Sequence, residues 1–128
     1  MEQLHFTSRV LGKKATERLE KKEVTQTIRS ENHSFIQAIF SVQLKPGEPV
    51  QVVLNDRLIG VATYLNLDPV KWHHLDTGDA CRGGFDNRFE LASALKRAGY
   101  RFKDLEEYFF WRCIFSWPEE KEVNSGVS

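Results

Sequence analysis

The sequence has few cysteines and no long apolar run, and both shortages narrow the kind of protein that it can encode. Its two cysteines, Cys81 and Cys113, are too few for a disulfide framework, so we expect free, buried thiols. No apolar stretch approaches the ~18 residues that a membrane span requires. The N-terminal residues MEQLHFTSRV also lack the long apolar core of a signal peptide. We therefore expect a cytoplasmic protein without membrane association.

The chain also has no net charge, because 18 Lys and Arg balance 18 Asp and Glu. This balance excludes a nucleic-acid binder that is basic overall. The charges are unevenly distributed, however: residues 1–30 carry seven Lys and Arg against four acids, and residues 103–128 carry three against six. The basic N-terminal third either presents a local anion-binding face or consists of solvated helix faces, and the sequence leaves both open.

The chain does contain clear strand patterns. The segment VTQTIR at 24–29 alternates, which places Thr25, Thr27 and Arg29 on one face of a strand. Further on, two runs of high β propensity flank a tight turn at 55–57 and indicate a hairpin, which Asp68-Pro69 should end. The expected strands are a lead-in near 4–8, then 24–29, 50–54, 58–67 and 107–117.

Helix signals lie between these strands. Ser34 with Gln37 and Asn87 with Glu90 form capping-box patterns, and Gly99 is placed as a left-handed residue after a helix. The expected helices are 10–22, 34–43, 77–82 and 88–98. Helices that interrupt a mainly antiparallel sheet indicate an α+β fold whose strands curl into a small barrel or half-barrel. We expect one domain over residues 1–117 and a flexible polar tail over 118–128.

The order of these motifs resembles that of the ASCH domains, which belong to the PUA-like superfamily. The resemblance rests on LEKK at 19–22 before TQTIR at 25–29, a turn at 46–49, the strand opening IGVA at 59–62, and Gly84-Phe85 before a helix. It spans roughly residues 4–117. It implies a PUA-like pseudobarrel of mixed and antiparallel strands with flanking helices, and a cleft between the two. Members of this family bind RNA or modified nucleosides.

One bacterial branch of the family hydrolyses the acetyl amide of N4-acetylcytidine, and its three catalytic positions fall on Val24, Thr27 and Gly83. The branch has Lys and Glu where this chain has Val24 and Gly83. Neither of these two residues can accept a proton, so an active Thr27 would need Lys22 or Glu23 as a substitute. We therefore expect an RNA- or nucleotide-binding module. A small hydrolase acting on a modified nucleoside is the alternative, and the sequence leaves open whether the protein is an enzyme.

The expected site is a polar cleft at the T-x-T-x-R strand. It consists mostly of two kinds of side chain. Cations can bind phosphate, and aromatic rings near turns offer a surface on which a base could stack. The expected ligand-binding residues are Lys21, Lys22, Thr25, Thr27, Arg29, Tyr64, Trp72, Gly83, Gly84 and Phe85. In an enzyme, Thr27 and Lys22 would be the catalytic residues.

No cofactor or metal is expected. Trp72, His73 and His74 lie near Asp76, Asp79 and Cys81 in the sequence, but the paired spacing of zinc ligands is missing. Cys81 could be a nucleophile with His33 or His74 as its base, although a small buried helix residue is the simpler interpretation.

Gly83 and Gly84 allow two interpretations. In the first, Gly83 ends the helix 77–82 in a left-handed conformation, and Gly84 lets the chain reverse. In the second, the missing side chains leave room in the cleft where the catalytic relatives have a carboxylate. The pattern favours the turn.

Overall fold

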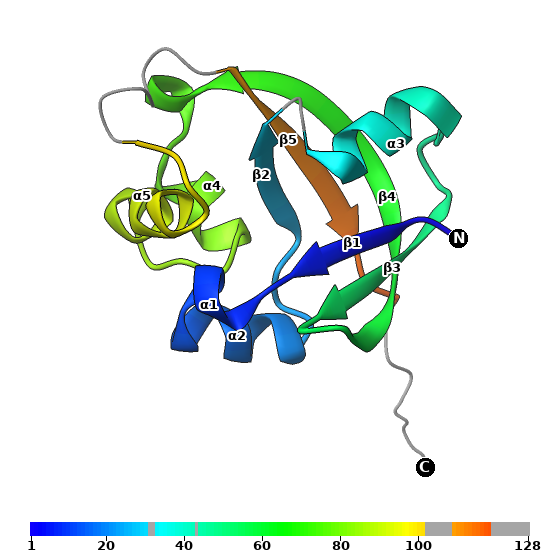
Figure 1. The fold of residues 1–128 in the computed structure, drawn as a ribbon, viewed down its shortest axis with the longest axis horizontal. Coiled ribbons are helices and arrows are strands. Elements are labelled where there is room, and N and C mark those ends of the chain that lie inside the picture. Colours follow the sequence, from blue (N-terminus) through cyan, green and yellow to red (C-terminus); the bar gives the residue numbers. More distant parts are fainter. Residues whose placement is uncertain (31–32, 43, 102–108, 119–128) are drawn as a thin grey trace.

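A computed structural model describes residues 1–30, 33–42, 44–101 and 109–118. Its centre is a five-stranded sheet in the order β1-β3-β4-β5-β2, which curls into a half-barrel (Figure 1). The strands are β1 (Gln3–Phe6), β2 (Gln26–Ser30), β3 (Pro49–Leu54), β4 (Arg57–Lys71) and β5 (Phe109–Ser116). Strand β1 is parallel to β3, and every other pair is antiparallel. The predicted α+β class and curled sheet are therefore confirmed.

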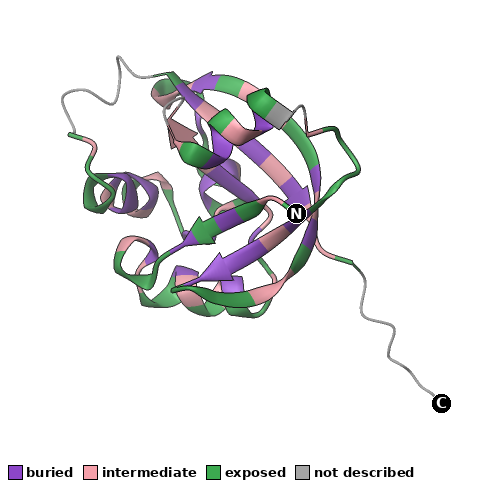
Figure 2. Ribbon diagram, turned by 45° about the vertical axis from the view of Figure 1, so that its right-hand side comes forward, coloured by how far each residue is buried: buried purple, intermediate pink, exposed green. Residues whose placement is uncertain are grey.

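The curl of the sheet follows from the length and irregularity of β4. This strand runs for 15 residues and pairs with β3 along its first half and with β5 along its second. Its register shifts opposite β5 between Tyr64 and Asn66, and β3 shifts between Val52 and Val53. Such bulges bend a strand and increase its twist. Buried residues are interspersed with more exposed ones along the bent strands (Figure 2).

The expected break at Asp68-Pro69 is wrong, because β4 continues to Lys71. Proline removes a backbone donor, so a strand tolerates it only where one edge is free. Pairing with β3 ends at Thr63, and Pro69 pairs only with Trp111 of β5. The strand is also held here by an ion pair, since Arg112 Nη2 lies 2.6 Å from Asp68 Oδ2.

The helices are α1 (Ser8–Leu11), α2 (Lys13–Glu20), α3 (Ser34–Val42), the 3₁₀ turn η1 (Trp72–His74), α4 (Thr77–Arg82) and α5 (Arg88–Arg97). The prediction for 77–82 is confirmed, and the prediction for 34–43 agrees with α3 up to the end of the residues described there. The single helix expected at 10–22 is wrong. Gly12 has φ +83 and ψ 171, a conformation that glycine alone adopts readily, and it divides that segment into α1 and α2.

Of the two predicted caps, the one at Ser34 needs correction and the one at Asn87 is confirmed. The ring of His33, not the Ser34 hydroxyl, receives the backbone N–H of Phe35 at the start of α3 (3.1 Å). Asn87 does cap α5, because its Oδ1 accepts the N–H of Glu90 (2.9 Å), and the carboxylate of Glu90 accepts from the N–H of Asp86. At the other end of α5, Gly99 has φ +112, as predicted.

The roles expected of the two adjacent glycines are reversed. Gly83 has φ −83, which any residue adopts, and Gly84 has φ +97. The N–H of Gly84 bonds to Cys81 O and the N–H of Phe85 to Ala80 O, which are the two bonds of a Schellman motif. Gly84 is therefore the left-handed residue that ends α4. It also lies against α2, because a Cβ there would be 3.3 Å from that of Ala15.

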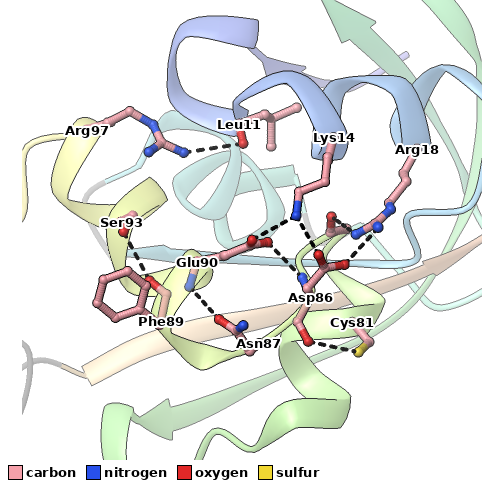
Figure 3. A network of polar contacts seen from close by, with 11 residues as sticks. Leu11, Lys14, Arg18, Cys81, Asp86, Asn87, Phe89, Glu90, Ser93 and Arg97 are labelled. Atoms are coloured by element: carbon pink, nitrogen blue, oxygen red, sulfur yellow. Dashed lines mark hydrogen bonds and ion pairs between the residues drawn. The ribbon is translucent and has the colours of Figure 1, made fainter.

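The chain segment that follows this turn is clamped to α2 by ion pairs (Figure 3). Lys14 Nζ lies 2.9 Å from Glu90 Oε2 and also contacts Asp86, and Arg18 Nη2 lies 2.7 Å from Asp86 Oδ1. Arg18 also donates to the backbone oxygen of Gly84 (2.9 Å). Two of the cations in the basic N-terminal third thus fix α2 to the α4–α5 connection.

Two further expectations concern residues that the structure does not describe. The expected tail falls largely on residues 119–128, and positions 107 and 108 of the expected last strand also lie outside the described residues. Among the helices of the described residues, none has both the length and the apolar character of a membrane span.

Candidate ligand-binding site

A cavity of about 370 Å³ opens between β2 and the helices α1, α4 and α5. Its walls are mainly apolar and include Leu11, Phe85, Leu91 and Leu95, all of them buried. The exposed residues His5, Thr7 and Arg9, from the junction of β1 and α1, lie at its edge. A concave, mostly apolar space with a few polar groups is the usual form of a small-molecule site.

One polar group in the cavity is centred on Arg29. Its Nε donates to Thr27 Oγ1 (3.0 Å), and its Nη2 donates to the backbone oxygen of His5 (2.7 Å). The guanidinium carbon lies 4.9 Å from the ring centre of Phe6. Burial lowers the pKa of Arg29 to about 10, so the side chain stays charged at neutral pH. Among the described residues, no carboxylate forms an ion pair with it.

His33 completes this group from the start of α3. Its Nε2 lies 2.7 Å from Arg29 Nη1, while its Nδ1 faces the N–H of Phe35. Burial, together with the charges of Arg29 and His5, lowers the pKa of His33 to about 4. The ring is therefore neutral near pH 7, and a neutral imidazole accepts a hydrogen bond at only one nitrogen. Both ring nitrogens face donors, Arg29 Nη1 and the N–H of Phe35, so one of these two donors finds no acceptor on the ring.

A second cluster of polar side chains surrounds Asp79, and here neighbouring side chains supply the hydrogen bonds that the carboxylate needs. Asp79 Oδ1 accepts hydrogen bonds from Gln26 Nε2 (3.0 Å), Arg82 Nη2 (2.8 Å) and Arg112 Nη1 (2.9 Å). Burial would raise the pKa of Asp79, but these bonds and the one from the N–H of Asp76 outweigh it and hold that pKa well below its usual range. The carboxylate is thus charged, paired and a poor proton acceptor, and it ties α4 to β2 and β5.

The structure brings together four of the residues expected in the site: Thr27, Arg29, Gly83 and Phe85 all line the cavity. Gly83 lies at the end of α4 and borders the cavity. A Cβ built there would lie 3.4 Å from its nearest neighbours, Ala80 O and the ring of Phe85. The two interpretations of the glycine pair thus apply to different residues, because Gly84 makes the turn and Gly83 borders the cavity.

Six other expected residues do not line the cavity. Lys22 lies with its Nζ 5.8 Å from the ring centre of Trp117, and the exposed Lys21 ends α2. Thr25 bonds through its backbone to Arg82 and Phe115, and Tyr64 is part of the core. Trp72 lies under the guanidinium of Arg88 (4.8 Å), and Gly84 packs against Val24.

Sequence patterns missed several cavity residues. His5 and Arg9, near the N-terminus, and Asp79 and Tyr100, more than 60 residues further on, reach the cavity from separate parts of the chain. Asp79 had a local signal, since it forms a capping box with Asp76, but that signal indicates a helix start and not a site. The alternation places Gln26 on the opposite face of the strand from Thr27, yet both residues line the cavity.

The positions that matter for catalysis in the resembling branch can also be located. Val24 is fully buried in the core, and Trp117 Nε1 donates to its backbone oxygen (2.7 Å). Neither Lys22 nor Glu23 is among the residues that line the cavity. Cys81 is exposed, its Sγ is 3.9 Å from Asp86 O, and it does not line the cavity either. Within the described part of the chain, no group of three or more His, Cys, Asp or Glu could hold a metal.

Comparison with protein-family models, with curated proteins and with solved structures finds no match to this chain.

Proposed function

We propose that this chain is an ASCH-like domain with a PUA-like pseudobarrel, and that it binds RNA or a nucleotide-like ligand in the cavity beside Thr27 and Arg29. The observation that carries the proposal is the convergence of Thr27, Arg29, Gly83 and Phe85 on one cavity of about 370 Å³. These residues belong to two sequence motifs that are more than 50 positions apart. The TQTIR motif and the glycine–phenylalanine motif are also among those that carry the ASCH resemblance.

The chemistry of the cavity suits such a ligand. The apolar wall formed by Phe85, Leu91 and Leu95 can take the flat face of a base, while Arg29 supplies a cation for phosphate. The hydroxyl of Thr27 accepts from Arg29, which leaves its own proton for an acceptor on the ligand. Free thiols at Cys81 and Cys113 suit the reducing cytoplasm, which we propose as the location.

Titration with short RNAs, nucleosides and nucleotides at low ionic strength tests this proposal. We expect the binding of RNA and nucleotides to weaken as salt is added, because phosphate contacts release counterions. Arg29→Ala should weaken it, whereas Arg57→Ala, which removes an exposed arginine paired with Glu20, should not. Absence of binding by all three ligand classes, or binding indifferent to Arg29→Ala, would reject the proposal.

The alternative function, hydrolysis of a modified nucleoside, has less support from the cavity. Its described lining includes no lysine, and the carboxylate of Asp79 is saturated by hydrogen bonds. Two histidines, His5 and His33, also line the cavity, and the pKa of about 4 makes His33 a weak base at neutral pH. Incubation with N4-acetylcytidine, followed by a search for released cytidine, separates the two functions.

A further inference from the structure

The charges that line the cavity do not cancel, and their excess is positive. Asp79 is matched by Arg82 and Arg112, with N–O distances of 2.8 and 2.9 Å. Arg9 and Arg29 also line the cavity, and neither forms an ion pair with a carboxylate in the described residues. The hydrogen bond that Arg9 makes within the described part of the chain goes to a neutral acceptor, the backbone oxygen of Arg97 (3.2 Å). Two guanidinium charges are thus left for a ligand.

The contact between Arg29 and His33 suggests a place for an anion, because one tautomer of His33 turns it into a pair of facing donors. Arg29 Nη1 lies 2.7 Å from His33 Nε2, and His33 Nδ1 faces the N–H of Phe35. If Nδ1 accepts that bond and caps α3, Nε2 carries the proton, and two donors face each other. An anionic oxygen placed beside them would accept from both. A guanidinium carries five N–H groups, and three of those of Arg29 meet the contacts described. The other two can donate to the anion.

We propose that the ligand carries a terminal phosphate, as a nucleoside monophosphate or the phosphorylated end of an RNA does, and that Arg29 and His33 bind this phosphate. This inference rests on the proposed function and specifies its ligand. A phosphomonoester carries a charge of about −1.5 to −2 at neutral pH, which two guanidiniums balance, whereas a diester within a strand carries about −1. Arg9, at the edge of the cavity, contributes the second charge.

The size of the cavity supports a single nucleotide. A volume of about 370 Å³ is near the lower end of the range for sites that hold one small molecule. The base would lie between Phe85 and Leu95, with its phosphate directed towards Arg29. A nucleotide inside a strand would need two exits from the cavity, one for each end of the strand. The cationic residues of the lining lie on α1 and β2, which favours one phosphate on that side.

Calorimetric titration compares each nucleoside with its 5′- and 3′-monophosphates, and one short RNA with and without a terminal phosphate. We expect the phosphorylated member of a pair to bind at least about ten-fold more tightly, as charge-assisted hydrogen bonds predict. Arg29→Gln should remove this difference, because it removes the cation that binds the phosphate. Arg9→Gln, at an exposed position where folding is not at risk, should reduce the difference, and Arg57→Gln is the matched control.

The outcomes separate the inference from the function on which it rests. Nucleosides that bind as tightly as their monophosphates would overturn the phosphate site and leave the proposed function standing. RNA binding that is indifferent to the terminal phosphate would do the same. Absence of binding by nucleosides, nucleotides and RNA would overturn both. The comparison of ligand pairs uses the unaltered protein, so it decides the matter even if Arg29→Gln fails to fold.

Discussion

Gly84 and Val24 are in direct contact across the α4–β2 boundary: a Cβ built on Gly84 would lie 3.0 Å from Val24 Cγ2. This glycine therefore has two reasons to lack a side chain, since its φ of +97 also disfavours one. The space beside Gly84 is therefore taken by core residues, Val24 and Ala15. Gly83 differs on both counts, with φ −83 and its nearest neighbours at 3.4 Å.

The two glycines should accordingly respond differently to alanine. We expect Gly84→Ala to lower the free energy of unfolding by about 2 kcal/mol, from the left-handed conformation and the contact with Val24. Gly83→Ala should change it by less than about 0.5 kcal/mol, because its backbone suits alanine. Urea denaturation of both variants measures this. Equal losses would show that the turn is assigned to the wrong residue.

Acid should destabilise the protein through His33. The pKa of this residue is about 4 in the folded chain, mainly because of burial, and near its ordinary 6.5 in the unfolded chain. Between these values the unfolded chain binds a proton that the folded chain does not, so stability falls as the pH drops from about 6.5 to 4. His33→Asn keeps an acceptor for the cap of α3 but does not titrate.

Denaturation curves for the unaltered protein and His33→Asn test this over the same pH window. The variant should lose less stability between about pH 7 and 4.5 than the unaltered protein does. His74→Asn, at an exposed position outside the cavity, is the control and should keep the full slope. Identical pH slopes for the unaltered protein and His33→Asn would contradict the buried environment of His33.

The Asp79 network should be the main polar support of the fold. Asp79→Asn removes the charge that Arg82 and Arg112 share, and we expect a loss of about 3 kcal/mol, as for other broken buried pairs. Asp86→Asn is the matched comparison, because Asp86 also pairs with two cations but is exposed, and its loss should be clearly smaller. Thermal unfolding of the two variants gives the order, and the reverse order would refute the network's role.

Restoring one catalytic group of the resembling branch should not create an enzyme. Gly83→Glu places a carboxylate on the cavity wall, but Val24 stays apolar and buried in the core. Catalytic groups that act as a unit lose nearly all activity when one is missing. We expect no cytidine release from N4-acetylcytidine by this variant. Detectable release would show that another residue of the cavity serves as the base.

Local patterns in the sequence predicted much of the fold and less of the site. Alternation located β2, and turn signals located the β3–β4 hairpin, because both depend on neighbouring residues. The continuation of β4 through Pro69 depends on where β3 stops pairing, which a local pattern does not contain. The cavity shows the same limit. Thr27 and Arg29 were found from their strand, whereas His5 and Asp79 join them only through tertiary packing.

The central claim is that a nucleotide binds in the cavity, and titration of ¹⁵N-labelled protein with nucleoside 5′-monophosphates, followed by amide chemical shifts, tests it most directly. Binding there should move the signals of Thr27, Arg29, Gly83 and Phe85, which line the cavity, and leave that of Lys22 in place. Shifts that instead centre on Lys21, Lys22 and Trp72, or no shifts at any ligand concentration, would contradict the claim.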